Sequence, residues 1–185
     1  MVVGFFVIVL IIMIITLSII LLRLYIVSRH PNVPKFGVKS ASISSFNLTS
    51  SELAAELNIV LNVTTHDIFH SISYDNVSIS INNDMHNQTL LASGYLAPFS
   101  QEKGHNTIYK EVQLNMNVQH DVETDGFSNG MVNFEIVLST IVTLKGDFNF
   151  RREVPLKVVC NPLSFKLDSG SLNWVLVKDL TCKEL

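Results

Sequence analysis

Residues 2–22 contain no charged side chain. An α-helix rises 1.5 Å per residue, so a run of this length measures about 30 Å, roughly the thickness of the hydrocarbon core of a bilayer. The run is rich in Ile, Val and Leu on every side, which suits lipid better than a half-solvated protein core. We therefore expect a transmembrane anchor over residues 2–27, with Arg23 and Tyr25 reaching the membrane surface.

A cleavable signal peptide is the alternative to an anchor. Such peptides have an apolar run of about 7–15 residues followed by a cleavage site with small side chains. The run here is longer, and no triplet of the small-x-small type follows it. The sequence therefore favours an anchor over cleavage.

Charge divides the remaining chain into two parts. Residues 28–39 form a basic neck with Arg29, Lys35 and Lys39, which either rests on anionic headgroups or is a solvated linker. Residues 40–185 carry nine basic side chains and all sixteen acidic ones, a net charge of −7. This charge excludes a nucleic-acid-binding domain, and the length is typical of one domain with its own core.

Apolar side chains in residues 40–185 recur at every second position, which is the pattern of β-strands. Over residues 53–63 every odd-numbered position is apolar, from Leu53 to Val63. Further runs of this kind cover residues 42–48, 72–81, 90–96, 112–118, 132–144, 148–160, 163–167 and 172–177.

One of these strands changes phase. Ile72 and Tyr74 point to one face, whereas Val77 and Ile79 have the opposite parity, so we expect a bulge at Asp75-Asn76. Eight or nine strands separated by Gly, Asn and Asp turns predict an all-β fold, a two-sheet antiparallel sandwich preceded by one helix.

The two cysteines, Cys160 and Cys182, lie 22 positions apart near the C-terminus. Cys160 ends one predicted strand and Cys182 follows the last one, so a hairpin that doubles back brings them together. We expect a disulfide, which would contribute about 3 kcal/mol in the chain-entropy model. Two separate buried thiols, as in a cytosolic protein, are the alternative.

Four Asn-x-Ser/Thr sequences are candidate N-glycosylation sites, at Asn47, Asn62, Asn76 and Asn87. Asn62 falls on the polar face of its predicted strand, Asn76 at the phase change and Asn87 in a turn. A glycan at any of these three positions would stay outside the core.

Three segments of the chain resemble one known family. They are His70-Ser71-Ile72-Ser73-Tyr74-Asp75, Leu91-Ala92-Ser93-Gly94-Tyr95-Leu96-Ala97-Pro98-Phe99-Ser100-Gln101 and Leu156-Lys157-Val158-Val159-Cys160. Together with the N-terminal span they resemble the plant late embryogenesis abundant subgroup-2 domain of membrane-anchored disease-resistance and harpin-induced-like proteins. The resemblance implies an immunoglobulin- or fibronectin-like sandwich and a role in defence or stress at the plasma membrane, with no known catalysis.

Metal and catalytic motifs give weak signals. His66 and His70 have metal-ligand spacing only on a helix, and on an extended chain they lie about 13 Å apart, so we expect a surface loop. Asp121–Gly126 begins like a calcium loop, but Val132 occupies the position of its bidentate Glu. Lys145-Gly146-Asp147 fits a hairpin turn better than an adhesion motif. We expect no cofactor, no metal and no enzymatic activity.

Three classes of function remain. A membrane-anchored interaction module with a protein or cell-wall partner is favoured, and a lipid or apolar-ligand binding domain at the membrane surface is the alternative. A hydrolase whose site is assembled in space from one of the histidines is the third. Arg23 and Arg29 favour a cytosolic domain, but long domains translocate largely regardless of flanking charge. We expect the domain outside or in the lumen, on the plasma membrane or another secretory-pathway membrane.

Overall fold

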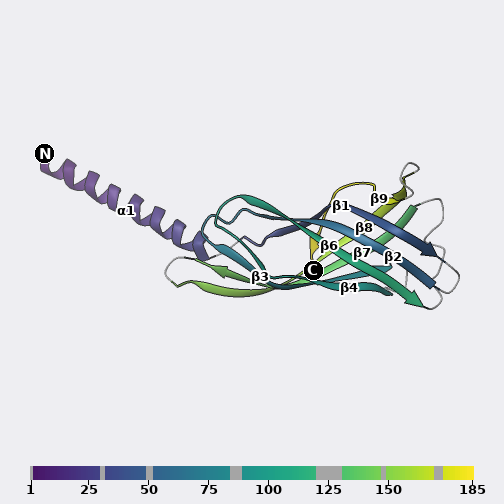
Figure 1. Ribbon diagram of the computed structural model, residues 1–185. Helices are drawn as coiled ribbons and strands as arrows, with labels where there is room; N and C mark the ends of the chain where they lie inside the picture. Colours follow the sequence, from purple (N-terminus) through teal and green to yellow (C-terminus); the bar gives the residue numbers. More distant parts are fainter. Residues whose placement is uncertain are drawn as a thin grey trace. The chain divides into compact units, whose positions relative to one another are not determined.

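The computed structural model describes residues 2–29, 32–48, 52–83, 89–119, 131–146, 149–168 and 173–185. The chain divides into two compact units, Met1–Asn32 and Val33–Leu185. Helix α1, Val2–Arg29, forms the first unit (Figure 1). The window Phe6–Arg23 has a mean hydropathy of 3.0, and none of it is buried. This helix is long and apolar enough to cross a membrane, a property that it shares with signal sequences.

The second unit is built from antiparallel strands, which confirms the predicted all-β fold. The described residues form β1 Lys35–Leu48, β2 Glu52–Thr65, β3 Ser71–Asn83, β4 Leu90–Leu96, β5 Phe99–Gln101, β6 Asn106–Gln119, β7 Met131–Lys145, β8 Arg151–Leu167, β9 Trp174–Leu176, β10 Leu180–Thr181 and β11 Lys183–Glu184. The long strands run along roughly one common direction (Figure 1).

The strand order is β4-β3-β7-β8-β9-β1-β2-β6. One half of this sheet, β4, β3, β7 and β8, packs against the other half, β1, β2 and β6. Across the core between them the rings of Phe36 and Tyr74 meet edge to face, with centroids 5.9 Å apart. The two end strands of this order, β4 and β6, also lie close together. A Cβ atom on Gly94 of β4 would lie 2.3 Å from the Leu114 side chain of β6. The sheet is therefore nearly closed.

The predicted phase change in β3 is confirmed. Tyr74 and Val77 are both fully buried, although their positions differ in parity. The pairing of β3 with β7 slips between Asp75 and Ser78, and Asn76 has a φ of 40°. The bulge turns both parts of the strand toward the core.

The C-terminal strap, residues 173–185, closes the seam between β8 and β1. β9 pairs with both strands, β10 pairs with β1, and β11 pairs with β8. The predicted hairpin between residues 163–167 and 172–177 is present, with Phe165 opposite Leu176. β10 and β11 were not predicted, because two-residue ladders show no apolar periodicity.

Some predicted boundaries differ from the structure. α1 continues to Arg29 and β1 begins at Lys35, so the segment between them is shorter than the predicted neck. Two strands predicted over residues 148–160 and 163–167 form the single strand β8, which passes through a cis Asn161–Pro162 peptide. The segment Asp121–Gly126 lies outside the described residues.

Candidate functional site

The four candidate glycosylation sites lie in different surroundings. Asn47 and Asn76 are exposed. Asn62 is half-buried, and a Cβ atom on Gly37 would lie only 2.6 Å from its Oδ1 atom, so the Asn62 side chain covers that glycine. Asn87 lies outside the described residues. Glycosylation at these positions stays a prediction.

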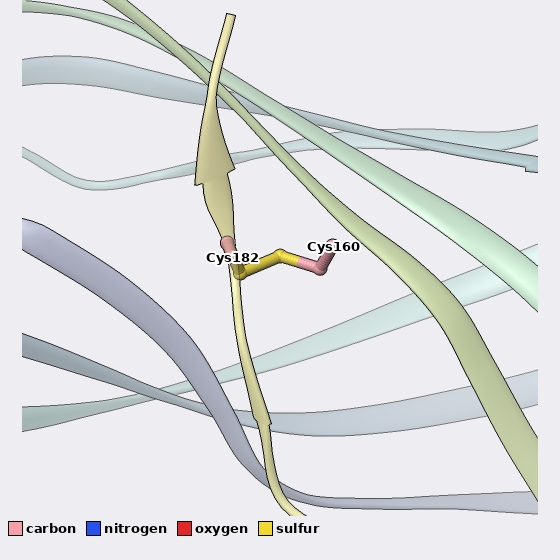
Figure 2. Close-up of a disulfide and its surroundings, with 2 residues drawn as sticks. All are labelled: Cys160 and Cys182. Carbon is pink, nitrogen blue, oxygen red and sulfur yellow. A yellow bond between two sulfur atoms is a disulfide. The ribbon is translucent and has the colours of Figure 1, made fainter.

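A disulfide joins Cys160 of β8 to Cys182 in the strap, the pairing expected from the sequence (Figure 2). The two Cα atoms are 4.2 Å apart, and the described residues include no free cysteine. The backbone N–H of Cys182 donates to the carbonyl of Phe36 in β1 at 2.9 Å. The strap is therefore held covalently to β8 in one half of the sheet and by hydrogen bonds to β1 in the other.

Tyr74, Phe99 and Gln101, from two of the three segments quoted above, form a cluster in which Tyr74 and Gln101 are buried. The Tyr74 hydroxyl donates to Gln101 Oε1 at 2.5 Å, and Gln101 Nε2 donates to the carbonyl of Val63 at 3.0 Å and to Asn106 Oδ1 at 2.8 Å. Phe99 stacks on Tyr74 with centroids 4.4 Å apart. Burial raises the pKa of the Tyr74 hydroxyl far above its usual value, which keeps it a donor. This cluster joins β2, β3, β5 and β6.

The segment His66–His70 is only in part the surface loop that we expected. Asp67 and His70 are 2% exposed, and His70 Nδ1 lies 2.9 and 3.0 Å from the two Asp67 carboxylate oxygens. Asp67 Oδ1 also accepts from the backbone N–H groups of Phe69 and His70 at 2.9 Å. Because the carboxylate is satisfied by its own loop, this pair organises the turn between β2 and β3.

His66 contacts His105 rather than His70. Both side chains are exposed, their rings stack with centroids 4.2 Å apart, and their Nδ1 atoms are in contact. Within the described ranges no group of three or more His, Cys, Asp or Glu side chains is placed to hold a metal ion. The sequence could not predict this pairing, because the two histidines are 39 positions apart.

The surface of the β domain carries a groove of about 780 Å³, which we call the strap groove. Its floor is the outer face of β1, β2 and β6, and Val175, Leu176 and Asp179 of the strap form one wall. The volume falls within the range of about 300–1,000 Å³ that is usual for small-molecule sites. The floor side chains are Ser40, Ser42, Asn58, Val60, Glu111 and Gln113.

Strand register arranges the floor in rows. Ser42 lies opposite Asn58, which lies opposite Gln113, so one hydroxyl and two amides form a row across three strands. A second row holds Ser40, Val60 and Glu111. Neighbouring members of a row are separated by the strand spacing of about 4.7–4.9 Å. The floor is therefore a regular array of hydrogen-bonding groups.

Charged groups border the groove. Lys39 Nζ lies 2.6 Å from Asp179 Oδ2, and both side chains are more than half exposed. The hydrogen bond to Asp179, and then the charge of Asp179, raise the pKa of Lys39, with a smaller contribution from Tyr109. Gln113 Nε2 donates to Glu56 Oε1. Lys39 is therefore paired with Asp179, and Glu111 is a further charged side chain that lines the groove.

A second depression, of about 610 Å³, lies on the outer face of β3, β7 and β8. It contains the exposed apolar side chains of Ile141 and Leu185, together with Pro155. Asn76 also lines it, so a glycan at this position would lie against the depression.

Sequence reasoning did not identify either depression. The alternation that predicted β2 also placed Asn58 and Asn62 on its outer face, and this was the available signal for the floor of the strap groove. The strands that pair with β2, and the path of the strap beside β1, depend on contacts between distant parts of the chain.

Comparisons with known proteins yield no family assignment. No family model and no curated protein matches the chain. Among solved structures, a protein described as ApaA from Bordetella pertussis aligns over 70% of this chain and 93% of its own, with 7% identity and a TM-score of 0.42. A protein from Archaeoglobus fulgidus aligns over 64% of this chain and 94% of its own, with 17% identity and a TM-score of 0.30.

Proposed function

We propose that this chain is a membrane-anchored, non-enzymatic interaction module that acts in plant defence or abiotic-stress response at the plasma membrane. The observation that carries the anchoring is the exposure of α1, because its window Phe6–Arg23 is strongly apolar and wholly unburied. Lipid is the environment in which such a surface is favourable. The cellular role rests on the family resemblance.

We place the domain outside the cell or in the lumen of the secretory pathway. The disulfide between Cys160 and Cys182 supports this side of the membrane, because structural disulfides persist in oxidising compartments. The exposed sequences at Asn47 and Asn76 are compatible with glycosylation there.

A domain that binds a lipid or another apolar ligand is the alternative function. Such a domain needs apolar space between the two halves of the sandwich. The strap groove and the second depression both lie on outer faces, and the largest core side chains between the halves, such as Phe36 and Phe134, are buried. We therefore favour an interaction surface on the outside of the sandwich, with the strap groove at its centre.

Photo-crosslinking in intact cells tests this function. A diazirine amino acid at Val60, on the floor of the strap groove, should capture the partner. The same amino acid at Val159, which is also half-buried but lies on β8, is the matched control. We expect an adduct that is specific to position 60. The same adducts at both positions, or none at position 60, would contradict the proposal.

A further inference from the structure

We propose that the strap groove binds a neutral polysaccharide chain. This inference rests on the proposed function and names the partner class for the same surface. It follows from three properties of the groove: the spacing of its polar groups, the aromatic ring at one end and the sign of its charge.

The polar groups suit a ligand covered with hydroxyl groups. Asn58 and Gln113 each offer an amide donor and an amide acceptor, and Ser42 offers a hydroxyl in the same row. Adjacent members of the row are about 4.7–4.9 Å apart, which is comparable to one pyranose unit of an extended chain. Sugar hydroxyl groups both donate and accept, so they can satisfy such an array directly or through water.

Tyr109 supplies an aromatic platform at the end of the array. It continues the outward face of β6 two residues before Glu111, and it lies opposite Asn62 of β2. Tyr109 is 59% exposed, and its row lies next to the row of Val60 and Glu111 on the floor of the groove. A tyrosine offers an apolar ring face and a polar hydroxyl, which match the C–H face and the hydroxyl groups of a sugar.

Charge selects a neutral chain over an acidic one. Lys39 is already paired with Asp179, and Gln113 is hydrogen-bonded to Glu56. Of the charged side chains that line the groove, Lys39 and Asp179 pair with each other, and Glu111 adds a negative charge to the floor. A polymer of uronic acids would meet like charges there, which opposes binding.

Isothermal titration calorimetry of the full chain in neutral-lipid nanodiscs tests the inference. Endoglycosidase treatment beforehand keeps any glycan on Asn62 out of the groove. The probes are cellohexaose, mannohexaose and xylohexaose, with hexagalacturonic acid as the anionic comparison. We expect at least one neutral hexasaccharide to bind, and to bind more tightly than the anionic one.

Matched tyrosine variants locate the site. Tyr109→Ala should weaken binding by about tenfold, as expected for loss of an aromatic anchor. Tyr95→Ala is the control, because Tyr95 is 77% exposed but lies on β4 in the other half of the sandwich. Asn58→Ala should also weaken binding, and because Asn58 is exposed, its removal should leave the fold intact.

Three results would overturn the inference: no heat with any neutral hexasaccharide, tighter binding of the anionic one, or equal losses in Tyr109→Ala and Tyr95→Ala. A protein adduct at Val60 in the crosslinking experiment, without sugar binding, would leave the proposed function standing and remove the polysaccharide. Absence of both signals would remove both proposals.

Discussion

The buried hydroxyl of Tyr74 contributes to the stability of the β domain. This hydroxyl is fully buried and bonded to Gln101, so replacing it with hydrogen leaves a buried amide oxygen without this donor. We expect Tyr74→Phe to lower the free energy of unfolding by about 1–3 kcal/mol. Tyr95→Phe removes an exposed hydroxyl and should have no measurable effect. Urea unfolding of the full chain in detergent compares the two, and equal midpoints for both variants would contradict this account.

The same hydroxyl predicts a loss of stability at alkaline pH. Burial raises the pKa of Tyr74 in the folded state, whereas in the unfolded chain it titrates near its usual value of about 10. The stabilisation is complete below pH 10 and is lost as pH rises from there toward the folded-state pKa. Between pH 9 and about 11 the unfolding midpoint of the wild type should fall more steeply than that of Tyr74→Phe. Parallel curves would show that Tyr74 is not the group responsible.

Gly37 is a residue at which any side chain is excluded. A Cβ atom there would lie 2.6 Å from Asn62 Oδ1 and 2.8 Å from the backbone oxygen of Leu180 in the strap. The amide can move but the strap backbone is paired, so we expect Gly37→Ala to cost about 1–3 kcal/mol of stability. Ser40→Ala, on the exposed face of the same strand, is the control. A thermal midpoint for Gly37→Ala equal to that of the control would mean that the strap shifts freely.

Among the elements, the strap links the two halves of the sheet, because its strands pair with β8 in one half and with β1 in the other. Replacing Cys160 and Cys182 with serine should lower stability by about 3 kcal/mol, the entropy of a closed loop of 22 residues. The loss should be accompanied by faster hydrogen exchange at the Val177, Cys182 and Leu185 amides, which bond to β8 and β1. Unchanged exchange at these three amides would show that the strap ladders are sufficient without the disulfide.

The elements also show what the sequence could predict. Long strands with one buried face were predicted because their side chains alternate, as in residues 53–63, and the bulge at Asn76 was predicted because the alternation changes phase. β5, β10 and β11 were missed because two or three residues cannot establish a period. The buried Asp67–His70 pair was missed because a polar segment between two strands has the same composition whether its side chains are buried or exposed. The strap groove was missed because it depends on the pairing of β1 with β2 and the strap, and of β2 with β6, and these pairings cannot be read from the periodicity of a single sequence.

For the whole molecule, we propose that α1 spans a membrane and holds the β domain on its non-cytosolic side. The neighbouring arginines favour the opposite orientation, whereas the disulfide and the exposed glycosylation sequences favour this one.

Protease protection in sealed microsomes tests that claim most directly. The full chain is synthesised in their presence, the vesicles are sedimented, and protease is added outside with and without detergent. We predict that a band containing residues 33–185 sediments with the membranes, survives protease in intact vesicles and disappears when detergent is present. Digestion of that band in intact vesicles would place the domain in the cytosol. Alkaline carbonate opens the vesicles without dissolving the bilayer, so release of residues 33–185 into the supernatant by carbonate would show that α1 does not anchor the chain; either result contradicts the account.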